Sequence, residues 1–408
     1  MGTGWERYLL GSSTYLALHR AVNGGQRIAT DHSRKFLLRA LWNHHRMAAE
    51  RPTSQHLRAV SDSSAAQSQP ARSEAAHRPT VWAVAALAGV SKTTVSRVLT
   101  NSPRVSPQAR LAVEKAIKKL NYVPNRAARA LVTRRADTLA LIVSEPETRL
   151  FSEPFFAGTV RGINQELART DYAFVLLSAE GDTSKVERYI MNGHADGVIL
   201  MSLHRRDALV RLLAQSRTPV VLAGRPFPGE SVPYVDADNR AGASAAVRHL
   251  VERGRQRIAT IAGPADMPVG VDRLEGFHDA LPAGSRRSWR RLVEHGDFSE
   301  DSGEIAMRKL LERVPDLDAV FAASDLMAIG AMRALRAAGR NVPGDVAVVG
   351  FDDSHAARLA NPQLTSVRQP MEEIGRSLAR LLLNEVRNPG HRSASLIVPT
   401  ELIIRESS

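Results

Sequence analysis

The chain has 408 residues, of which 43% are apolar, with 55 Lys and Arg against 42 Asp and Glu, a net charge of +13 and no cysteine. At about 150 residues per domain, this length suggests two or three domains. The lack of cysteine excludes disulfides, thiolate metal sites and a cysteine nucleophile. No apolar run approaches the roughly 20 residues of a membrane span, so we expect a soluble cytoplasmic protein without membrane association.

Residues 1–78 differ in composition from the rest of the chain. Positions 48 to 78 are mostly Ala, Ser, Gln, Arg and His, as in SDSSAAQSQPARSEAAHRP. Such a segment cannot bury enough apolar surface to offset its ordering entropy, and Met47 offers an alternative start. We therefore expect residues 1–78 to be a disordered or misassigned extension.

The positive charge is concentrated in a short part of the chain. Residues 79–135 carry 11 basic side chains and one acidic one, whereas residues 136–408 carry 33 basic and 36 acidic ones. This asymmetry is typical of a polyanion-binding module joined to a separate globular one, because phosphate neutralisation supplies most of the sequence-independent affinity for nucleic acid. A solvated basic face is the alternative at this point.

Residues 79–124 are predicted to form three short helices. Thr80 can cap a helix over 81–88, Gly89 supplies a turn, and Ser91 can cap a helix over 92–99. A third helix is expected over 107–120, with Ser106 as its cap and Pro107 at its first position. Its expected inward residues are Leu111, Val113, Ala116, Ile117 and Leu120. Three short basic helices predict a helix-turn-helix DNA-binding domain.

Residues 125–136 are predicted to be a hinge helix and linker. The run NRAARALVTRR is bounded by Pro124 and Thr133. It is shorter than the 12 to 15 residues at which isolated helices are marginal in water. We expect it to fold only against a partner.

Residues 137–408 alternate apolar runs with amphipathic helical segments. The expected strands are TLALIVS, FVLLS, GVILM, PVVLAG, RIATIAG, AVFAAS and VAVVGFDD, and the expected helices include 158–169, 184–193, 239–253, 303–313 and 325–339. Continuous apolar strands between helices predict a doubly wound α/β core with a parallel sheet and ligands at the carboxyl ends of the strands. About 270 residues of this pattern favour two lobes.

The motifs AGVS…TVSRVL, RVSP and LNYVPN, followed by an Ala-rich hinge, closely resemble the DNA-binding head of lactose-repressor (LacI/GalR) family regulators. The resemblance continues through EPFFAGTVRGI, ADGVIL, DRLEGF, SDLMAIGAMRAL, VAVVGFDD and PTELIIRES. It implies a helix-turn-helix head and hinge helix joined to a two-lobed, periplasmic-binding-protein-like core. It also implies a homodimeric regulator, most simply a repressor, that binds a near-palindromic operator in double-stranded DNA under the control of a mono- or oligosaccharide effector.

The resemblance also assigns residues to DNA. Lys92, Thr93 and Arg97 match base-reading positions, and Arg97 can present its guanidinium fork to guanine. The other DNA-binding positions implied are Thr80, Ser91, Thr94, Ser96, Arg104, Tyr122, Asn125, Ala128 and Leu131. For Thr94 and Ser96, helix capping or packing is an equal alternative to phosphate contact.

Leu131 matches a wedge position. In the family this apolar side chain enters the minor groove between two central base pairs. Without the resemblance, an ordinary linker or core leucine would be the simpler interpretation of Leu131.

In the core, the resemblance assigns effector binding to Ser144, Phe156, Arg225, Arg273, Phe298, Ser324 and Asp352. Arg273 and Asp352 suit a polyol, because a guanidinium donates in a planar fork while a carboxylate accepts hydroxyl protons. A structural ion pair for Arg273 and core packing for the two phenylalanines remain alternatives. Gly224, where some sugar-inducible members carry an acid, and Ser324, where Asn is common, leave the ligand's identity open.

Two departures from the family concern the head. Ala83 stands where an acidic residue is usual, which could weaken a cap or packing contact, and Thr100 stands where Asn is frequent, which puts one phosphate contact in doubt.

Catalysis is not expected. The sequence has no GxGxxG, HExxH or GxSxG motif, no catalytic triad and no metal-ligand spacing, so we expect neither an enzyme nor a cofactor nor a bound metal. A sugar-delivering solute-binding protein is the main rival, but it needs an export signal, which is not evident, and has no use for a basic head. An enzyme on the same core is a third possibility.

Overall fold

The computed structural model describes residues 79–123, 135–179, 183–205, 207, 209, 217–229, 231–282, 289–390 and 393–408. The expectations for residues 1–78, and for Asn125, Ala128 and Leu131, fall outside these residues. None of the helices within the described ranges is long and apolar enough to cross a membrane.

The head contains the three predicted helices, with the predicted caps. They are α3 (Val81–Ala88), α4 (Lys92–Leu99) and α5 (Pro107–Leu120). The hydroxyls of Thr80, Ser91 and Ser106 each accept a hydrogen bond from the backbone N–H three residues later, at 3.3, 3.1 and 3.3 Å. Gly89 ends α3 with a positive φ of 65°, a conformation that glycine adopts without a steric cost. The helix-turn-helix prediction is confirmed.

The core of the head is small and aliphatic. Its buried members are Val84, Ala85, Val95, Val98, Val113 and Ala116. The prediction for Leu111 was wrong, because its side chain is 54% exposed. At 100° per residue, Leu111 lies about 200° around α5 from Val113, so it points away from the face that packs on α3.

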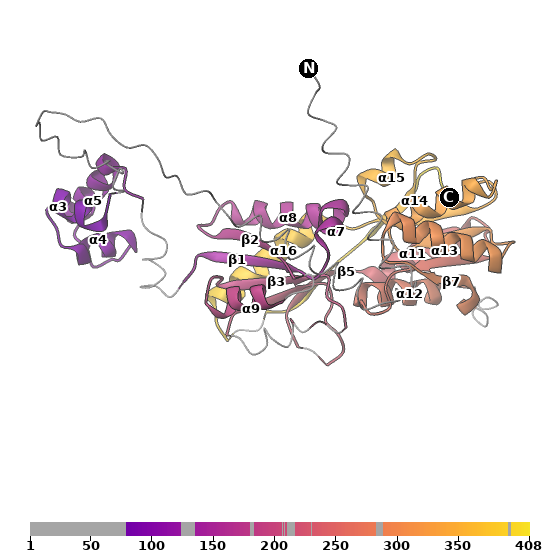
Figure 1. Ribbon diagram of the computed structural model, residues 1–408, viewed down its shortest axis with the longest axis horizontal. Helices are drawn as coiled ribbons and strands as arrows, with labels where there is room; N and C mark the ends of the chain where they lie inside the picture. Colours follow the sequence, from indigo (N-terminus) through magenta and orange to yellow (C-terminus); the bar gives the residue numbers. More distant parts are fainter. Residues whose placement is uncertain are drawn as a thin grey trace, which may run out of the picture. The chain divides into compact units, whose positions relative to one another are not determined.

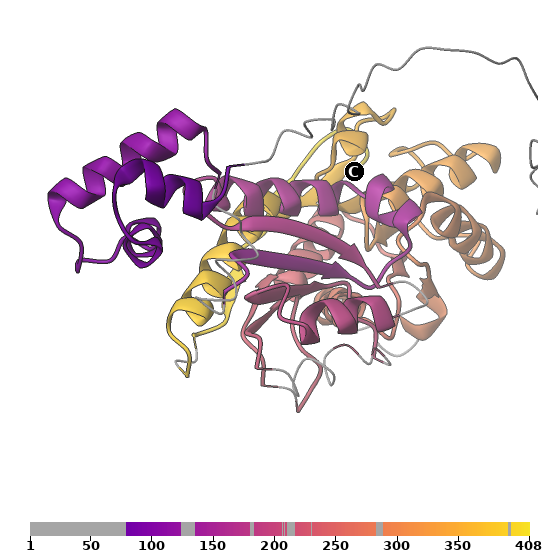
Figure 2. The same cartoon turned by 60° about the vertical axis from the view of Figure 1, so that its left-hand side comes forward.

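The first lobe (N lobe) is a six-stranded parallel sheet in the order β11-β5-β4-β3-β1-β2. Its strands are β1 (Thr138–Val143), β2 (Ala173–Ser178), β3 (Gly197–Met201), β4 (Val220–Ala223), β5 (Tyr234–Ala237) and β11 (Leu396–Val398). Its helices are α7 (Glu147–Ser152), α8 (Pro154–Leu167), α9 (Ser184–Met191) and α16 (Met371–Arg387). Alternate residues of β1 pack against α8 and α16 on one face and against α9 on the other (Figure 1, Figure 2).

The second lobe (C lobe) repeats this plan in the order β12-β10-β9-β8-β6-β7, with β12 antiparallel to β10. Its strands are β6 (Ile258–Ala262), β7 (Val293–His295), β8 (Ala319–Ala322), β9 (Ala347–Asp352), β10 (Thr365–Arg368) and β12 (Glu401–Ile403). Its helices are α11 (Asn239–Glu252), α12 (Pro268–Ala280), the 3-10 turn η2 (Trp289–Leu292), α13 (Glu300–Arg313), α14 (Asp325–Ala337) and α15 (His355–Leu359). Helices α11 and α12 cover one face of this sheet, and α13 and α14 cover the other.

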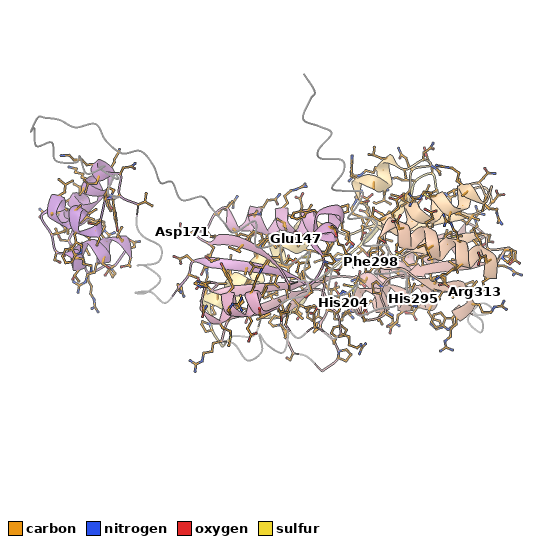
Figure 3. All side chains as sticks on the ribbon, in the orientation of Figure 1. Glu147, Asp171, His204, His295, Phe298 and Arg313 are labelled. Carbon is orange, nitrogen blue, oxygen red and sulfur yellow. The ribbon has the colours of Figure 1, made fainter. Side chains whose placement is uncertain are left out.

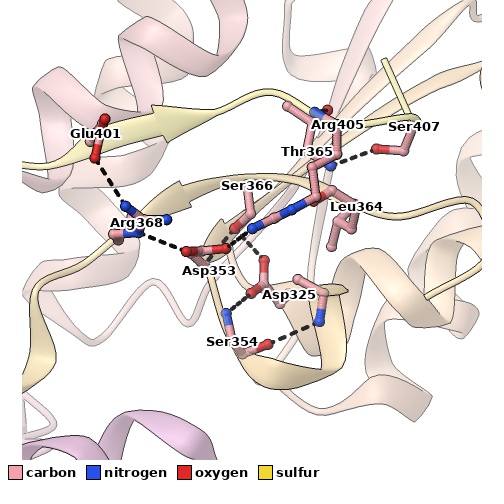
Figure 4. A network of polar contacts seen from close by, with 11 residues as sticks. Asp325, Asp353, Ser354, Leu364, Thr365, Ser366, Arg368, Glu401, Arg405 and Ser407 are labelled. Carbon is pink, nitrogen blue, oxygen red and sulfur yellow. Dashed lines mark hydrogen bonds and ion pairs between the residues drawn. The ribbon is translucent and has the colours of Figure 1, made fainter. Parts of the chain in front are cut away.

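The chain passes between the lobes three times: from β5 to α11, from β10 to α16 and from β11 to β12. A network of charged and hydroxyl side chains lies on the C-lobe side of the last two crossings (Figure 4). Arg368 on β10 contacts Asp353 at 2.7 Å and Glu401 at 3.2 Å, and Arg405 also contacts Asp353. These ion pairs hold the ends of the two crossing segments together.

Candidate DNA-binding surface and effector pocket

Helix α4 exposes the three predicted base-reading residues. Lys92, Thr93 and Arg97 are exposed, whereas Val95 and Val98 are buried in the head core. The three exposed side chains lie within about 140° of one another around the helix at 100° per residue. This surface has the composition and width of a helix face that can enter a major groove.

The hydroxyls at the start of α4 already have partners within the head. Ser91 Oγ lies 2.9 Å from Thr94 Oγ1 and also accepts the Thr94 backbone N–H. Thr94 and Ser96 are half-buried. Ser91 is therefore the cap that was predicted, and Thr94 takes part in this capping. The phosphate contacts of Ser91, Thr94 and Ser96 stay predictions.

The two departures from the family pattern have local explanations. Thr80 caps α3 through the backbone N–H of Ala83 without an acidic side chain. Thr100 Oγ1 donates to the carbonyl of Ser96 at 3.0 Å and to that of Arg97 at 3.3 Å, so it closes the end of α4.

Two further predicted DNA contacts lie in different settings. Arg104 is exposed in the loop before α5, while Tyr122 is half-buried against the head core. Arg110, another basic residue of the head, does not point freely to solvent but hydrogen-bonds to this loop. Its guanidinium donates to Asn101 Oδ1 and to the Ser102 carbonyl, both at 2.9 Å.

A pocket lies between the two lobes at the carboxyl ends of their strands. Six of the seven predicted effector residues line it: Phe156, Arg225, Arg273, Phe298, Ser324 and Asp352. Ser144 follows β1 but is not among the lining residues; its backbone N–H donates to the Met201 carbonyl at 3.2 Å. Residues of both lobes therefore face one cavity.

Arg273 and Asp352 form the polar centre of this pocket. Arg273 is 4% exposed, and its Nη1 lies 3.6 Å from Asp352 Oδ1. Its guanidinium also donates to Asn239 Oδ1 at 2.9 Å and to the Ala323 carbonyl at 2.5 Å, and lies 3.7 Å from the centre of the Phe351 ring. Burial raises the pKa of Asp352 to about 6, although the charge of Arg273 opposes this shift. The structural ion pair and a ligand-binding role are thus compatible.

The aromatic and hydroxyl residues have mixed surroundings. Phe156 is 2% exposed and packs in the N-lobe core, so only part of it reaches the pocket. Ser324 Oγ caps α14 through the Met327 N–H and donates to the Phe298 carbonyl, both at 3.2 Å. Phe298 has a φ of 73°, a strained value for a side chain of this size, and such values cluster at ligand sites.

A second group of charges surrounds Arg225 at the junction of the lobes. Arg225 Nε lies 3.9 Å from Asp236 Oδ2 and 3.6 Å from Asp272 Oδ2, a residue of α12 in the C lobe. Burial raises the pKa of Asp236 to about 6, and the nearby charge of Asp272 adds to this effect. Asp236 also accepts a hydrogen bond from Asn239 at 2.9 Å, which links this group to Arg273.

Sequence reasoning missed several lining residues. Asp236 lies within β5, a strand that was not predicted, and Asn239 begins the helix that follows it. Gln369, in the crossing after β10, donates to Asp352 Oδ1 at 2.6 Å. Arg149 and Glu153 come from α7 and the turn before α8. A carboxylate near the end of a short strand was the available signal for Asp236. No group of His, Asp and Glu that could hold a metal ion occurs among the residues that the structure describes.

A helix-turn-helix head with an exposed basic recognition helix, joined to a two-lobed α/β core with a polar interlobe pocket, defines a ligand-responsive DNA-binding regulator. Residues 80–125 match the model of the bacterial regulatory proteins of the lacI family, and residues 247–408 match that of a periplasmic binding protein-like domain. The HTH-type transcriptional regulator CelR of Thermobifida fusca is 52% identical over 338 residues, which cover 82% of this chain and 99% of CelR. The chain therefore belongs to the lacI family, whose members are transcriptional regulators and not enzymes.

Similarity to solved structures supports the same family assignment. A CelR–cellobiose complex matches with a TM-score of 0.65 and 49% identity over 81% of this chain and 100% of that one. A lac repressor dimer bound to operator and the anti-inducer ONPF matches with a TM-score of 0.70 and 27% identity over 81% of this chain and 98% of that one. The predicted family, fold class and regulatory function are confirmed.

Proposed function

We propose that this chain is a homodimeric repressor that binds a near-palindromic operator in the cytoplasm and responds to a β-linked glucose disaccharide of the cellobiose class. The observation that carries the effector assignment is the buried Arg273–Asp352 pair beside Phe298 in a pocket shared by both lobes. Its support from outside the chain is the CelR–cellobiose complex at 49% identity.

The chemistry of the pocket suits a sugar. Asp352 accepts from hydroxyl groups, Arg273 donates to them, and the apolar face of a pyranose ring can stack on Phe298. Arg225 and Asp236, which line the same pocket, supply a second donor and acceptor. A ligand with two rings can engage both groups at once.

The proposed response is a linkage between the pocket and DNA. A sugar that contacts both lobes favours one separation of the lobes, and that separation decides whether the hinges of two subunits can pair on the operator. Lys92, Thr93 and Arg97 read bases, Thr80, Ser91, Thr94, Ser96, Arg104, Tyr122, Asn125 and Ala128 contact the DNA around them, and Leu131 enters the minor groove. A coupling of about 1 to 3 kcal/mol changes operator occupancy 5- to 150-fold.

The test is binding of the purified full chain to DNA fragments from beside its coding region, at two salt concentrations, with cellobiose, maltose, glucose or no sugar. We expect saturable, sequence-specific binding whose affinity changes with cellobiose and not with maltose. The variant Asp352→Asn serves as a control, because it should bind DNA as the wild type does while losing the response to cellobiose. Cellobiose binding without specific DNA binding would instead support a solute-binding protein.

A further inference from the structure

A row of charged side chains crosses from one lobe to the other beside the pocket. Asp266, which follows β6 in the C lobe, places Oδ2 2.9 Å from His204 Nδ1, and His204 follows β3 in the N lobe. The other ring nitrogen of His204, Nε2, lies 3.4 Å from Glu145 Oε1. Figure 3 shows His204 and Phe298 where the two lobes meet.

The row continues into the pocket wall. Glu145 Oε2 accepts from Arg149 Nη1 at 2.9 Å, and Arg149 Nε contacts Glu153. The Arg149 guanidinium lies 5.4 Å from the centre of the Phe298 ring. Arg149, Glu153 and Phe298 line the pocket, whereas His204, Glu145 and Asp266 do not. The row therefore starts outside the effector site and ends in it.

The geometry favours a positive charge on His204. Only a doubly protonated imidazole can donate from both ring nitrogens, and here both nitrogens face carboxylates. Glu145 is 3% exposed, and its Oε1 has no hydrogen-bond partner within the described residues, so an uncharged His204 would leave a buried carboxylate oxygen without a positive neighbour. The neighbouring carboxylates of Glu145 and Asp266 raise the pKa of His204 to about 9, although burial opposes this shift.

The surroundings of His204 reinforce this arrangement. The backbone N–H of His204 donates to Asp207 Oδ2 at 3.2 Å, and that of Arg205 donates to the Asp266 carbonyl at 2.9 Å. The Arg205 guanidinium stacks on Phe227 at 5.2 Å. Among the described residues, the carboxylates of Glu145 and Asp266 face the ring nitrogens, Asp207 accepts from the His204 backbone, and the cations Arg149 and Arg205 lie on the neighbouring Glu145 and Phe227.

We propose that His204 is a positioning residue that couples the approach of the two lobes to the placement of Arg149 and Glu153 in the effector pocket. Its part in effector binding depends on the proposed function, but its effect on lobe separation does not. When His204 bridges Glu145 and Asp266, the lobes are held together and Arg149 stands over Phe298. When the bridge is broken, the lobes separate more readily and this wall of the pocket loses its C-lobe partner.

The sign of the pH dependence follows from the raised pKa. The bridge stabilises the closed arrangement fully below the ordinary pKa of histidine, about 6.5, and this stabilisation is lost as the pH rises through about 9. The lobes should therefore open as the pH rises from 7 to 9.5. A His204 that stays neutral between pH 7 and 9.5 would not produce this profile.

The absence of cysteine allows a direct measurement of lobe separation. Spin labels are attached to K185C on α9 and K309C on α13, both at exposed positions, and the distance between them is measured by pulsed electron resonance without effector. At pH 7 we expect one narrow distribution that broadens at pH 9.5. His204→Gln should show the broad distribution at both pH values, and Asp266→Asn should broaden it at pH 7. His194→Gln, a change at an exposed N-lobe histidine that contacts Tyr189, should behave like the wild type.

Calorimetric titration with cellobiose provides the second readout. We expect His204→Gln to weaken cellobiose binding about tenfold at pH 7, within the usual range of coupling, with little difference from the wild type at pH 9.5. The proposal would be overturned if folded His204→Gln had the same distance distribution as the wild type at pH 7. It would also be overturned if the wild-type distribution did not change between pH 7 and pH 9.5. If the interlobe distance of the wild type changes with pH but the protein does not bind cellobiose, the effector assignment is wrong while the role of His204 in lobe separation is supported.

Discussion

The buried guanidinium of Arg273 provides the sharpest test of how the C lobe is held together. Replacement by Met keeps an unbranched apolar stem and removes the guanidinium with its charge and donors. The Asn239 Oδ1 and the Ala323 carbonyl then lose hydrogen bonds of 2.9 and 2.5 Å, and Asp352 loses a cation at 3.6 Å. Gln369 and the backbone of Asp325 still hydrogen-bond to Asp352, so the carboxylate keeps these bonds but loses its neighbouring cation.

The expected cost follows from this burial. Removing one partner of a buried ion pair typically costs about 3 to 5 kcal/mol, because it leaves the other charge buried and uncompensated. For a lobe of this size, this corresponds to a decrease in Tm of about 6 to 20 °C. The loss should be smaller at pH 5 than at pH 8, because Asp352, whose pKa burial already raises to about 6, takes up a proton when Arg273 is absent.

The measurement is thermal unfolding of the full chain by circular dichroism at both pH values. The matched control is Arg240→Met, which removes an arginine that also pairs with two carboxylates, Glu275 and Asp279, but at an exposed site, where ion pairs contribute little. If Arg273→Met and Arg240→Met unfold at the same temperature, burial does not determine how much the Arg273–Asp352 pair contributes to thermal stability.

Four further predictions concern other parts of the chain. Ser106→Ala should destabilise the head by about 1 kcal/mol through loss of the α5 cap, measured by calorimetry, and an unchanged head transition would refute this. Since burial raises the pKa of Asp236 to about 6, stability should fall as the pH rises from about 4 through 6, and Asp236→Asn should flatten this profile in urea titrations. Arg97→Gln should weaken operator binding by about 1 to 3 kcal/mol and random-sequence DNA much less. Leu131→Ala should likewise reduce specific more than non-specific affinity, and equal losses on both DNAs would contradict the wedge.

The local features of the head followed from the sequence because they depend on neighbouring residues. The caps of Thr80, Ser91 and Ser106 each join residues three positions apart, so the residue type and its place before a helical run are sufficient to predict them. The interior strands β1, β3, β4, β6, β8 and β9 were predictable because a strand covered on both faces is a continuous apolar run. The four-residue interior strands β5 and β10 were not predicted. The short edge strands β7, β11 and β12, of three residues each, have too little apolar contrast to be found this way.

The composition of the pocket and of the interlobe bridge depended on the tertiary structure. Family resemblance placed Arg273 and Asp352, but nothing in the local sequence indicated that Asn239 and Gln369 would hydrogen-bond to them. His204 and Asp266 are 62 residues apart and lie in different lobes. Parallel strands bring the ends of distant segments to one edge of a sheet, and the three crossings place two such edges face to face. Sequence by itself therefore determined the helices of the head, the long apolar strands, the family and the chemistry of individual residues, whereas only the packing of the two lobes decided which of those residues meet.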